Sequence, residues 1–67
     1  MEQKFNPAKV RGLRSENKTT QEELAKVVGI STNSYISKEN GKIDFKAEEL
    51  AKIANYYNVA ISIFFTK

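Results

Sequence analysis

The sequence predicts an all-α fold, a compact bundle of four to five helices. Two helix start signals support this prediction. Asn6-Pro7 combines a capping residue with a proline at the first helical position, and Thr20 is followed three residues later by Glu23 in a capping-box pattern. Apolar residues also recur at helical spacing, most clearly in residues 47–57.

The first two expected helices are short. One runs from about Pro7 to Asn17 and turns Val10 and Leu13 inward. The other begins after the capping box and ends at Val28. A helix of about eight residues does not persist in water on its own, so both helices depend on tertiary packing.

A glycine separates the second helix from a third one. Gly29 adopts a left-handed conformation without steric cost, which suits the end of a helix. Ser31 can then cap a helix over Thr32–Glu39. Asn40 and Gly41, which both tolerate positive φ, end it.

The fourth expected helix is the clearest one and covers Ala47–Tyr57, with Asn58 at its end. Lys46 precedes it and cannot act as a side-chain acceptor, so the helix starts poorly unless Asp44 helps.

Residues 59–66 allow two interpretations. Their apolar residues alternate as in a strand, but Val59, Ile61, Phe64 and Phe65 could equally cover one side of a short helix. In either case these apolar residues exceed what so small a core can bury, which indicates self-association.

Length and composition limit the possible functions. The 67 residues suffice for one domain over 1–67, with its core at about 6–65. The net charge of +3 is modest, and the absence of Cys and His excludes disulfides, cysteine-ligated zinc and histidine acid–base chemistry. We therefore expect no catalytic residues, metal site or cofactor, and no enzyme. No apolar run is long enough to span a membrane, and no signal-peptide pattern occurs, so we expect a cytoplasmic protein without a membrane partner.

The stretch from Gln21 to Gly41 carries the main functional signal. Two helices of about eight residues are joined by a short turn containing Gly29, and the small residue Ala25 lies four positions before that glycine. This spacing is typical of a helix-turn-helix, whose second helix enters the DNA major groove. Double-stranded DNA is therefore the expected ligand.

The segment T-Q-E-E-L-A-K-V-V-G-I-S, followed by S-Y-I-S-K-E-N-G-K, resembles the helix-turn-helix family of lambdoid phage repressors and Cro proteins, also called the xenobiotic-response-element family. The resemblance covers about residues 8–65, including V-R-G-L-R and E-E-L-A-K-I-A-N-Y-Y-N-V. It implies five helices, with a helix after Val59. It further implies a small transcriptional regulator of phage or prophage type that binds an inverted-repeat operator as a homodimer through its C-terminal apolar segment.

The same resemblance assigns roles to individual residues. Base-edge contacts fall on Thr32, Asn33 and Ser37, whose hydrogen-bonding groups and methyl group suit adenine and thymine edges. The alternative is that Thr32, Asn33 and Ser34 merely solvate the start of the helix. Arg14 and Glu39 correspond to a partly buried structural ion pair.

Phosphate contacts are expected from the residues around the recognition helix, where oriented amides and lysines face the DNA backbone. They are Gln21, Ser31, Lys38, Asn40, Lys42 and Lys46.

This chain departs from the family pattern in the third helix. Lys38 stands at a usually apolar position, and Ile36 on a usually polar face. Either the Lys38 ammonium reaches a phosphate, or the helix is rotated so that Ile36 packs inward and Ser37 misses the bases. Thr19 replaces a common Leu, which would weaken the junction of the first two helices, and Ile63 replaces a polar residue, which favours a dimer interface.

A second functional class stays open. The same fold can serve as a protein-interaction module, such as an antitoxin or anti-repressor, and the apolar C-terminal segment is compatible with that role.

Overall fold

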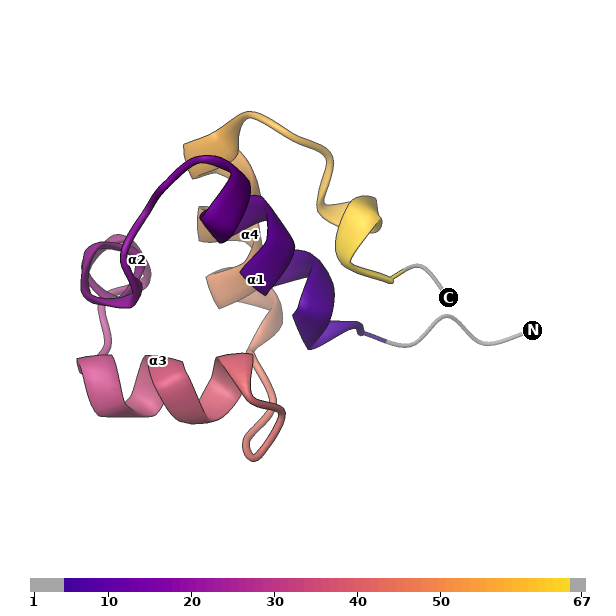
Figure 1. The fold of residues 1–67 in the computed structure, drawn as a ribbon. Helices are drawn as coiled ribbons and strands as arrows, with labels where there is room; N and C mark the ends of the chain where they lie inside the picture. Colours follow the sequence, from indigo (N-terminus) through magenta and orange to yellow (C-terminus); the bar gives the residue numbers. More distant parts are fainter. Residues whose placement is uncertain (1–4, 66–67) are drawn as a thin grey trace.

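The computed structural model describes residues 5–65. Its elements, in chain order, are the helices α1 (Pro7–Glu16), α2 (Gln21–Val28), α3 (Thr32–Glu39) and α4 (Ala47–Tyr57) and a 3₁₀ helix η1 (Ile61–Phe65). Figure 1 shows α3 along the lower edge of the molecule, with α2 above one of its ends and α1 and α4 above the other. Within residues 5–65 there is no strand, so the all-α prediction is confirmed and the strand interpretation of the C-terminal segment is wrong.

Each of the first three helices begins where a polar side chain satisfies its free backbone amides. Asn6 Oδ1 accepts a hydrogen bond from the N–H of Ala8 at 3.0 Å, and Ser31 Oγ accepts one from Ser34 at 3.1 Å. Thr20 and Glu23 form the reciprocal capping box at 3.0 and 2.9 Å. The short helices therefore start at the positions that the sequence predicts.

Glycine is needed at the turn between α2 and α3. Gly29 has φ +86°, and its N–H donates to Ala25 O at 2.8 Å. A residue with a Cβ is strained at this φ, so glycine lets α3 leave α2 sharply. After α3, Gly41 takes the left-handed conformation with φ +83°, whereas Asn40 stays in the right-handed helical region at −83°.

Every element contributes one fully buried apolar side chain to a common core. These are Val10, Leu24, Tyr35, Ile53 and Phe64, all with 0% exposure. α3 packs against α2 and α1, while η1 packs against α1 and α4. Helix α3 is therefore supported from one side by the rest of the domain.

The C-terminal segment is buried more than its composition predicts. Phe64 lies in the core, and Phe65 packs edge-to-face against Phe5 at a ring-centroid distance of 6.0 Å. The Asn6 N–H donates to Phe64 O at 2.8 Å, which joins the two ends of the described chain. Ile61 is the large side chain of η1 that stays exposed, at 39%. The surplus of unburied apolar residues expected here is thus largely absorbed by the domain itself.

No helix within residues 5–65 is both long enough and apolar enough to cross a membrane.

Candidate nucleic-acid interface

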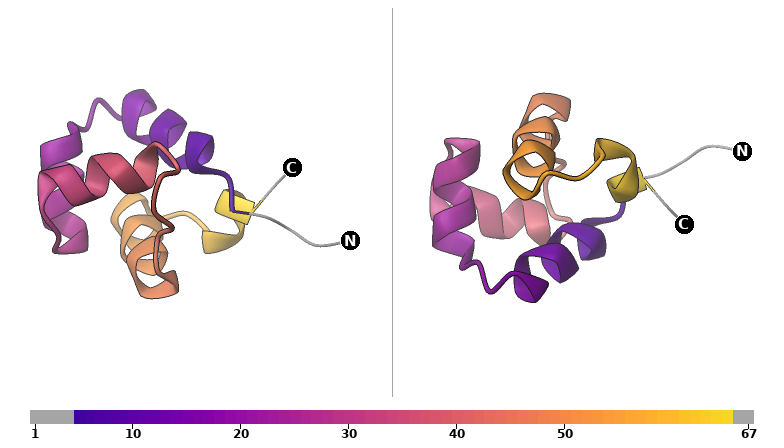
Figure 2. Two further views of the ribbon diagram at one scale, coloured as in Figure 1. Left: turned by 90° about the horizontal axis from the view of Figure 1, so that it is seen from below. Right: turned by 90° about the horizontal axis from the view of Figure 1, so that it is seen from above.

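Helix α3 has a buried side and an outward side. Tyr35, Lys38 and Glu39 are buried, with exposures of 0%, 8% and 1%. Figure 2 shows the whole length of α3 in the view from below, so its outward side is a surface of the molecule. Because residues of an α-helix are about 100° apart, the positions opposite Tyr35 are Asn33 and Ser37.

The three expected base-contacting residues lie on this outward side or at its border. Asn33 is exposed, Ser37 is partly buried one turn further on, and Thr32 is partly buried beside them. Asn33 and Ser37 therefore point from the same face of α3. The structure also shows no inward packing of Ile36, which is absent from the apolar side chains that contact the core in residues 5–65. The rotation considered from the sequence has not occurred.

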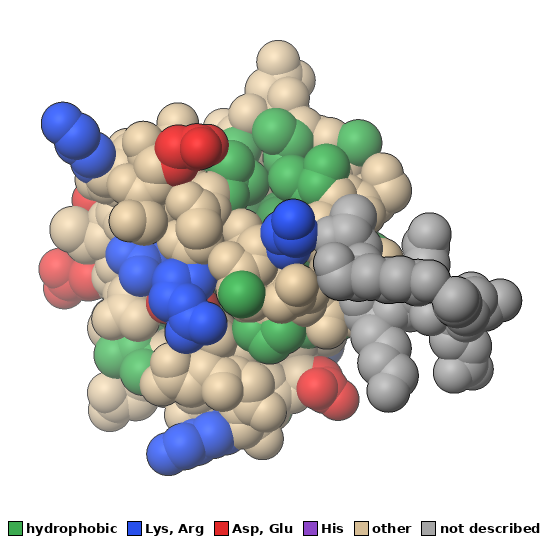
Figure 3. Space-filling model, turned by 45° about the vertical axis from the view of Figure 1, so that its right-hand side comes forward, with side chains coloured by type: hydrophobic (Ala, Val, Ile, Leu, Met, Phe, Trp, Pro, Cys, Tyr) green, Lys and Arg blue, Asp and Glu red, His purple; other side chains and the backbone are tan. Residues whose placement is uncertain are grey.

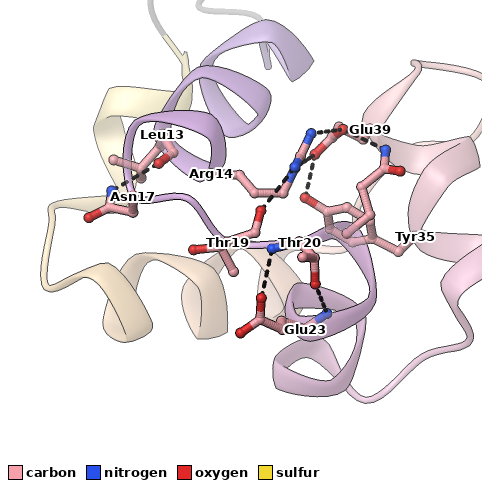
Figure 4. A network of polar contacts seen from close by, with 9 residues as sticks. Leu13, Arg14, Asn17, Thr19, Thr20, Glu23, Tyr35 and Glu39 are labelled. Carbon is pink, nitrogen blue, oxygen red and sulfur yellow. Dashed lines mark hydrogen bonds and ion pairs between the residues drawn. The ribbon is translucent and has the colours of Figure 1, made fainter.

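A buried polar network attaches α3 to α1 and α2 (Figure 4). Glu39 Oε2 accepts from Arg14 Nε at 2.8 Å and from the Tyr35 hydroxyl at 2.6 Å. Glu39 Oε1 accepts from Gln21 Nε2 at 3.0 Å and from Arg14 Nη2 at 3.2 Å. Arg14 Nη1 donates in addition to the backbone oxygen of Thr19 at 2.9 Å. The Arg14–Glu39 ion pair implied by the resemblance is thus present, and it fixes the C-terminal end of α3.

Protonation states follow from this network. Burial alone would raise the pKa of Glu39, but hydrogen bonds from Arg14, Tyr35 and Gln21 outweigh burial and lower it below its ordinary value. Burial and the hydrogen bond to Glu39 raise the pKa of the Tyr35 hydroxyl above its ordinary value. Glu39 therefore carries its negative charge at neutral pH, and Tyr35 keeps its proton and donates.

Lys38 is involved in a second buried ion pair, which corrects its assignment as a phosphate contact. Its Nζ lies 2.6 Å from Glu49 Oε1, and both side chains are buried. The ammonium is directed to α4 and not to the outward face. The Lys38 ammonium stays paired with the Glu49 carboxylate, because an unpaired ammonium in the interior would cost several kcal/mol.

Glu49 also completes the start of α4. Its Oε1 accepts from the backbone N–H of Lys46 at 2.8 Å, which is the half of a capping box that the third helical residue supplies, while the Lys46 side chain makes no cap bond of its own. The described side chain that supports the start of α4 is therefore Glu49 and not Asp44. Burial would raise the pKa of Glu49, but the Lys38 ammonium and the Lys46 N–H outweigh it and lower this pKa.

The other expected phosphate-contacting residues lie around α3. Ser31, Asn40, Lys42 and Lys46 are exposed. The Ser31 oxygen caps the helix, which leaves its hydroxyl proton free for another acceptor. Gln21 is only partly available for a phosphate, because one of its side-chain amide protons is donated to Glu39 Oε1.

On the face drawn in Figure 3, basic side chains do not form one continuous surface. Figure 3 shows Lys and Arg at several separate places on the face drawn there, among acidic side chains and hydrophobic patches. Because Lys38 is paired with Glu49, the expected phosphate-contacting residues keep two exposed lysines, Lys42 and Lys46, so phosphate contacts would be few for each chain. Within residues 5–65 no group of three or more His, Cys, Asp or Glu residues is arranged to hold a metal ion.

Sequence reasoning missed three features of this region. The roles of Glu49 and of the Tyr35 hydroxyl were not anticipated, and Thr19 was expected only to weaken a junction. Thr19 is buried, and its carbonyl accepts from Arg14. A usable signal for Glu49 was available, because it lies three residues after Lys46 in the pattern of a helix start.

Helices α2 and α3 are short and are joined by a glycine turn. Buried ion pairs hold the inner side of α3, and its outward side is polar. This arrangement defines a helix-turn-helix domain. The comparison with known families agrees, and the chain belongs to the helix-turn-helix domain family, whose sequence model matches residues 8–67.

One curated relative and one solved structure extend this result. The chain is 38% identical over 55 residues to the cryptic phage CTXphi transcriptional repressor RstR of Vibrio cholerae, a match that covers 82% of this chain and 50% of the relative. The chain therefore spans about half the length of this curated relative. The crystal structure of the clp gene regulator ClgR from C. glutamicum has a TM-score of 0.77 at 22% identity, over 87% of this chain and 75% of that one. The second likeness establishes the shared fold.

Proposed function

We propose that this chain is a sequence-specific double-stranded DNA-binding domain of a small transcriptional regulator of phage-repressor type. The observation that carries the proposal is the outward face of α3, where Asn33 and Ser37 stand one turn apart on a helix whose opposite face is held by buried ion pairs. A solvated helix face usually carries Lys and Glu, whereas short polar side chains suit base edges. The similarity to RstR, a transcriptional repressor, supports the same function.

The proposed mechanism places α3 in the major groove. Asn33 would bond an adenine edge through its amide, and Ser37 and Thr32 would contact neighbouring base edges. Ser31, Asn40, Lys42, Lys46 and the remaining amide proton of Gln21 would hold phosphates on either side. The domain would occupy residues 1–67 and act in the cytoplasm, where its DNA is.

One chain offers few phosphate contacts, so we further propose that two copies bind together on an inverted repeat. The exposed Ile61 of η1, at 39% exposure, is the apolar side chain of the C-terminal segment best placed for contact between copies. Successive major grooves on one face of the duplex then set the half-sites about 34–36 Å apart.

Selection of bound sites from a random duplex library tests this function. We expect an enriched motif with two-fold symmetry and half-sites about one helical turn apart. With the selected duplex, log K should fall linearly with log salt, with a slope of about 0.9 per phosphate neutralised. Recovery of no motif, or binding that does not change with salt, would contradict the proposal. A protein captured in place of DNA would favour the interaction-module alternative.

Replacing Asn33 by alanine should weaken binding to the selected site about 5- to 150-fold per half-site, since a good bidentate base contact contributes about 1–3 kcal/mol of discrimination. Binding to a random duplex should change little. Asn55→Ala, an exposed asparagine on α4, is the matched control. Competition electrophoretic mobility shift on both duplexes measures the two effects. Equal loss on selected and random DNA would show that Asn33 does not read a base.

A further inference from the structure

Ile36 is an apolar side chain on α3 that the proposed function has not used. It is partly buried, yet it is absent from the core cluster and from the side chains packed against that cluster in residues 5–65. Ile30, just before α3, is in contact with the core. Core packing therefore accounts for Ile30 but does not account for Ile36.

The helix holds Ile36 in this position. Tyr35 immediately before it is fully buried, and Lys38 and Glu39 after it are fixed by ion pairs at 2.6 and 2.8 Å. Turning Ile36 into the core would require all three of these residues to move outward. Burying an isoleucine cannot offset the loss of two buried ion pairs.

Ile36 lies four residues after Thr32 and three after Asn33, so these side chains are neighbours on the helix surface. Thr32 and Ile36 thus place methyl groups one turn apart along one border of the outward face. Asn33 and Ser37 place hydrogen-bonding groups along its middle.

The major groove offers one apolar group for such a border, the C5-methyl of thymine. We propose that Ile36 contacts a thymine methyl and makes the protein select thymine at that position of each half-site. This inference depends on the proposed DNA-binding function. It assigns to Ile36 a specificity role that hydrogen bonding by Asn33 cannot supply, because only the methyl distinguishes thymine from uracil.

The test removes the methyl from the DNA. Each thymine of the selected half-site is replaced in turn by deoxyuridine, symmetrically in both half-sites, and affinity is measured by fluorescence anisotropy. At one position, uracil should lower the affinity of the wild-type chain about fourfold per half-site, or about 15-fold for the pair. This is the effect expected when one apolar carbon is returned to water. Ile36→Ala should bind the thymine and uracil duplexes at that position equally well.

Ile43→Ala is the matched control, because Ile43 is the same side chain, 53% exposed, in the loop after α3. This variant should keep the preference for thymine. Ile36→Val, which removes one carbon, provides a second variant should Ile36→Ala unfold. Wild-type binding that is the same on every uracil duplex, or a preference that persists in Ile36→Ala, would overturn the role of Ile36. Failure of the wild type to prefer the selected duplex over random DNA would instead refute the proposed function.

Discussion

Replacing Glu39 by alanine is expected to lower the free energy of unfolding by about 3–5 kcal/mol. The change leaves the Arg14 guanidinium without its counter-charge and removes the acceptor of the Tyr35 hydroxyl and of Gln21. Small domains have total stabilities near the lower end of about 5–15 kcal/mol, so the variant should be largely unfolded at physiological temperature. Urea unfolding followed by circular dichroism measures the loss.

The same carboxylate should make stability depend on pH. The folded-state pKa of Glu39 lies below its ordinary value, so its stabilising contribution is complete above the unfolded-state pKa of about 4.3 and is lost as pH falls through the folded-state value. Glu39→Gln should therefore flatten the acid side of the curve of stability against pH. The slope that remains should come from Glu49 and Glu23, whose pKa values are also lowered.

Glu16→Ala is the matched control, since Glu16 is an exposed glutamate at the end of α1. It should change the free energy of unfolding by less than about 0.5 kcal/mol. Glu39 is buried, so Glu39→Ala should reduce DNA binding through loss of the folded recognition helix. A Glu39→Ala protein with a wild-type melting temperature and reduced affinity would contradict this explanation.

Local signals in the sequence were sufficient to predict the helix boundaries. Asn6, Thr20 with Glu23, and Gly29 each act on backbone groups within three or four residues of themselves, so their chemistry is readable without knowledge of the fold. The Arg14–Glu39 pair spans 25 residues, and only the resemblance to a known family pointed to it.

Features that depend on how helices cross were not predictable. Lys38 and Glu49 meet because the loop of residues 40–46 brings the start of α4 back to the C-terminal end of α3, and a phosphate was an equally reasonable partner for Lys38 from the sequence alone. Residues 59–66 met the pattern of a strand and of a helix alike. Burial of Phe64 between α1 and α4, with a backbone bond from Asn6, favours the 3₁₀ turn. Residue 66 lies outside the described residues.

The Lys38–Glu49 pair provides the second large expected effect. Lys38→Met and Glu49→Gln should each lower the free energy of unfolding by about 3–5 kcal/mol. The first leaves the buried Glu49 carboxylate without a counter-charge, and the second does the same to the buried Lys38 ammonium. The double variant has no buried charge at this place, and the amide oxygen that Glu49→Gln introduces can still accept from the Lys46 N–H. Its free energy of unfolding should therefore return to within about 1–2 kcal/mol of wild type, because a buried ion pair stabilises a protein little more than neutral side chains of similar volume do.

A double-mutant cycle in urea measures this coupling directly. Lys42→Met and Glu48→Gln are the matched controls for stability, because both residues are exposed and lie close to the pair in sequence. Their changes in the free energy of unfolding should be small and additive. Additive losses in Lys38→Met/Glu49→Gln would mean that the two side chains stabilise the domain independently. Recovery in the double variant, together with recovered affinity for the selected duplex, would show that α4 holds the recognition helix through the neutralisation of one buried charge by another.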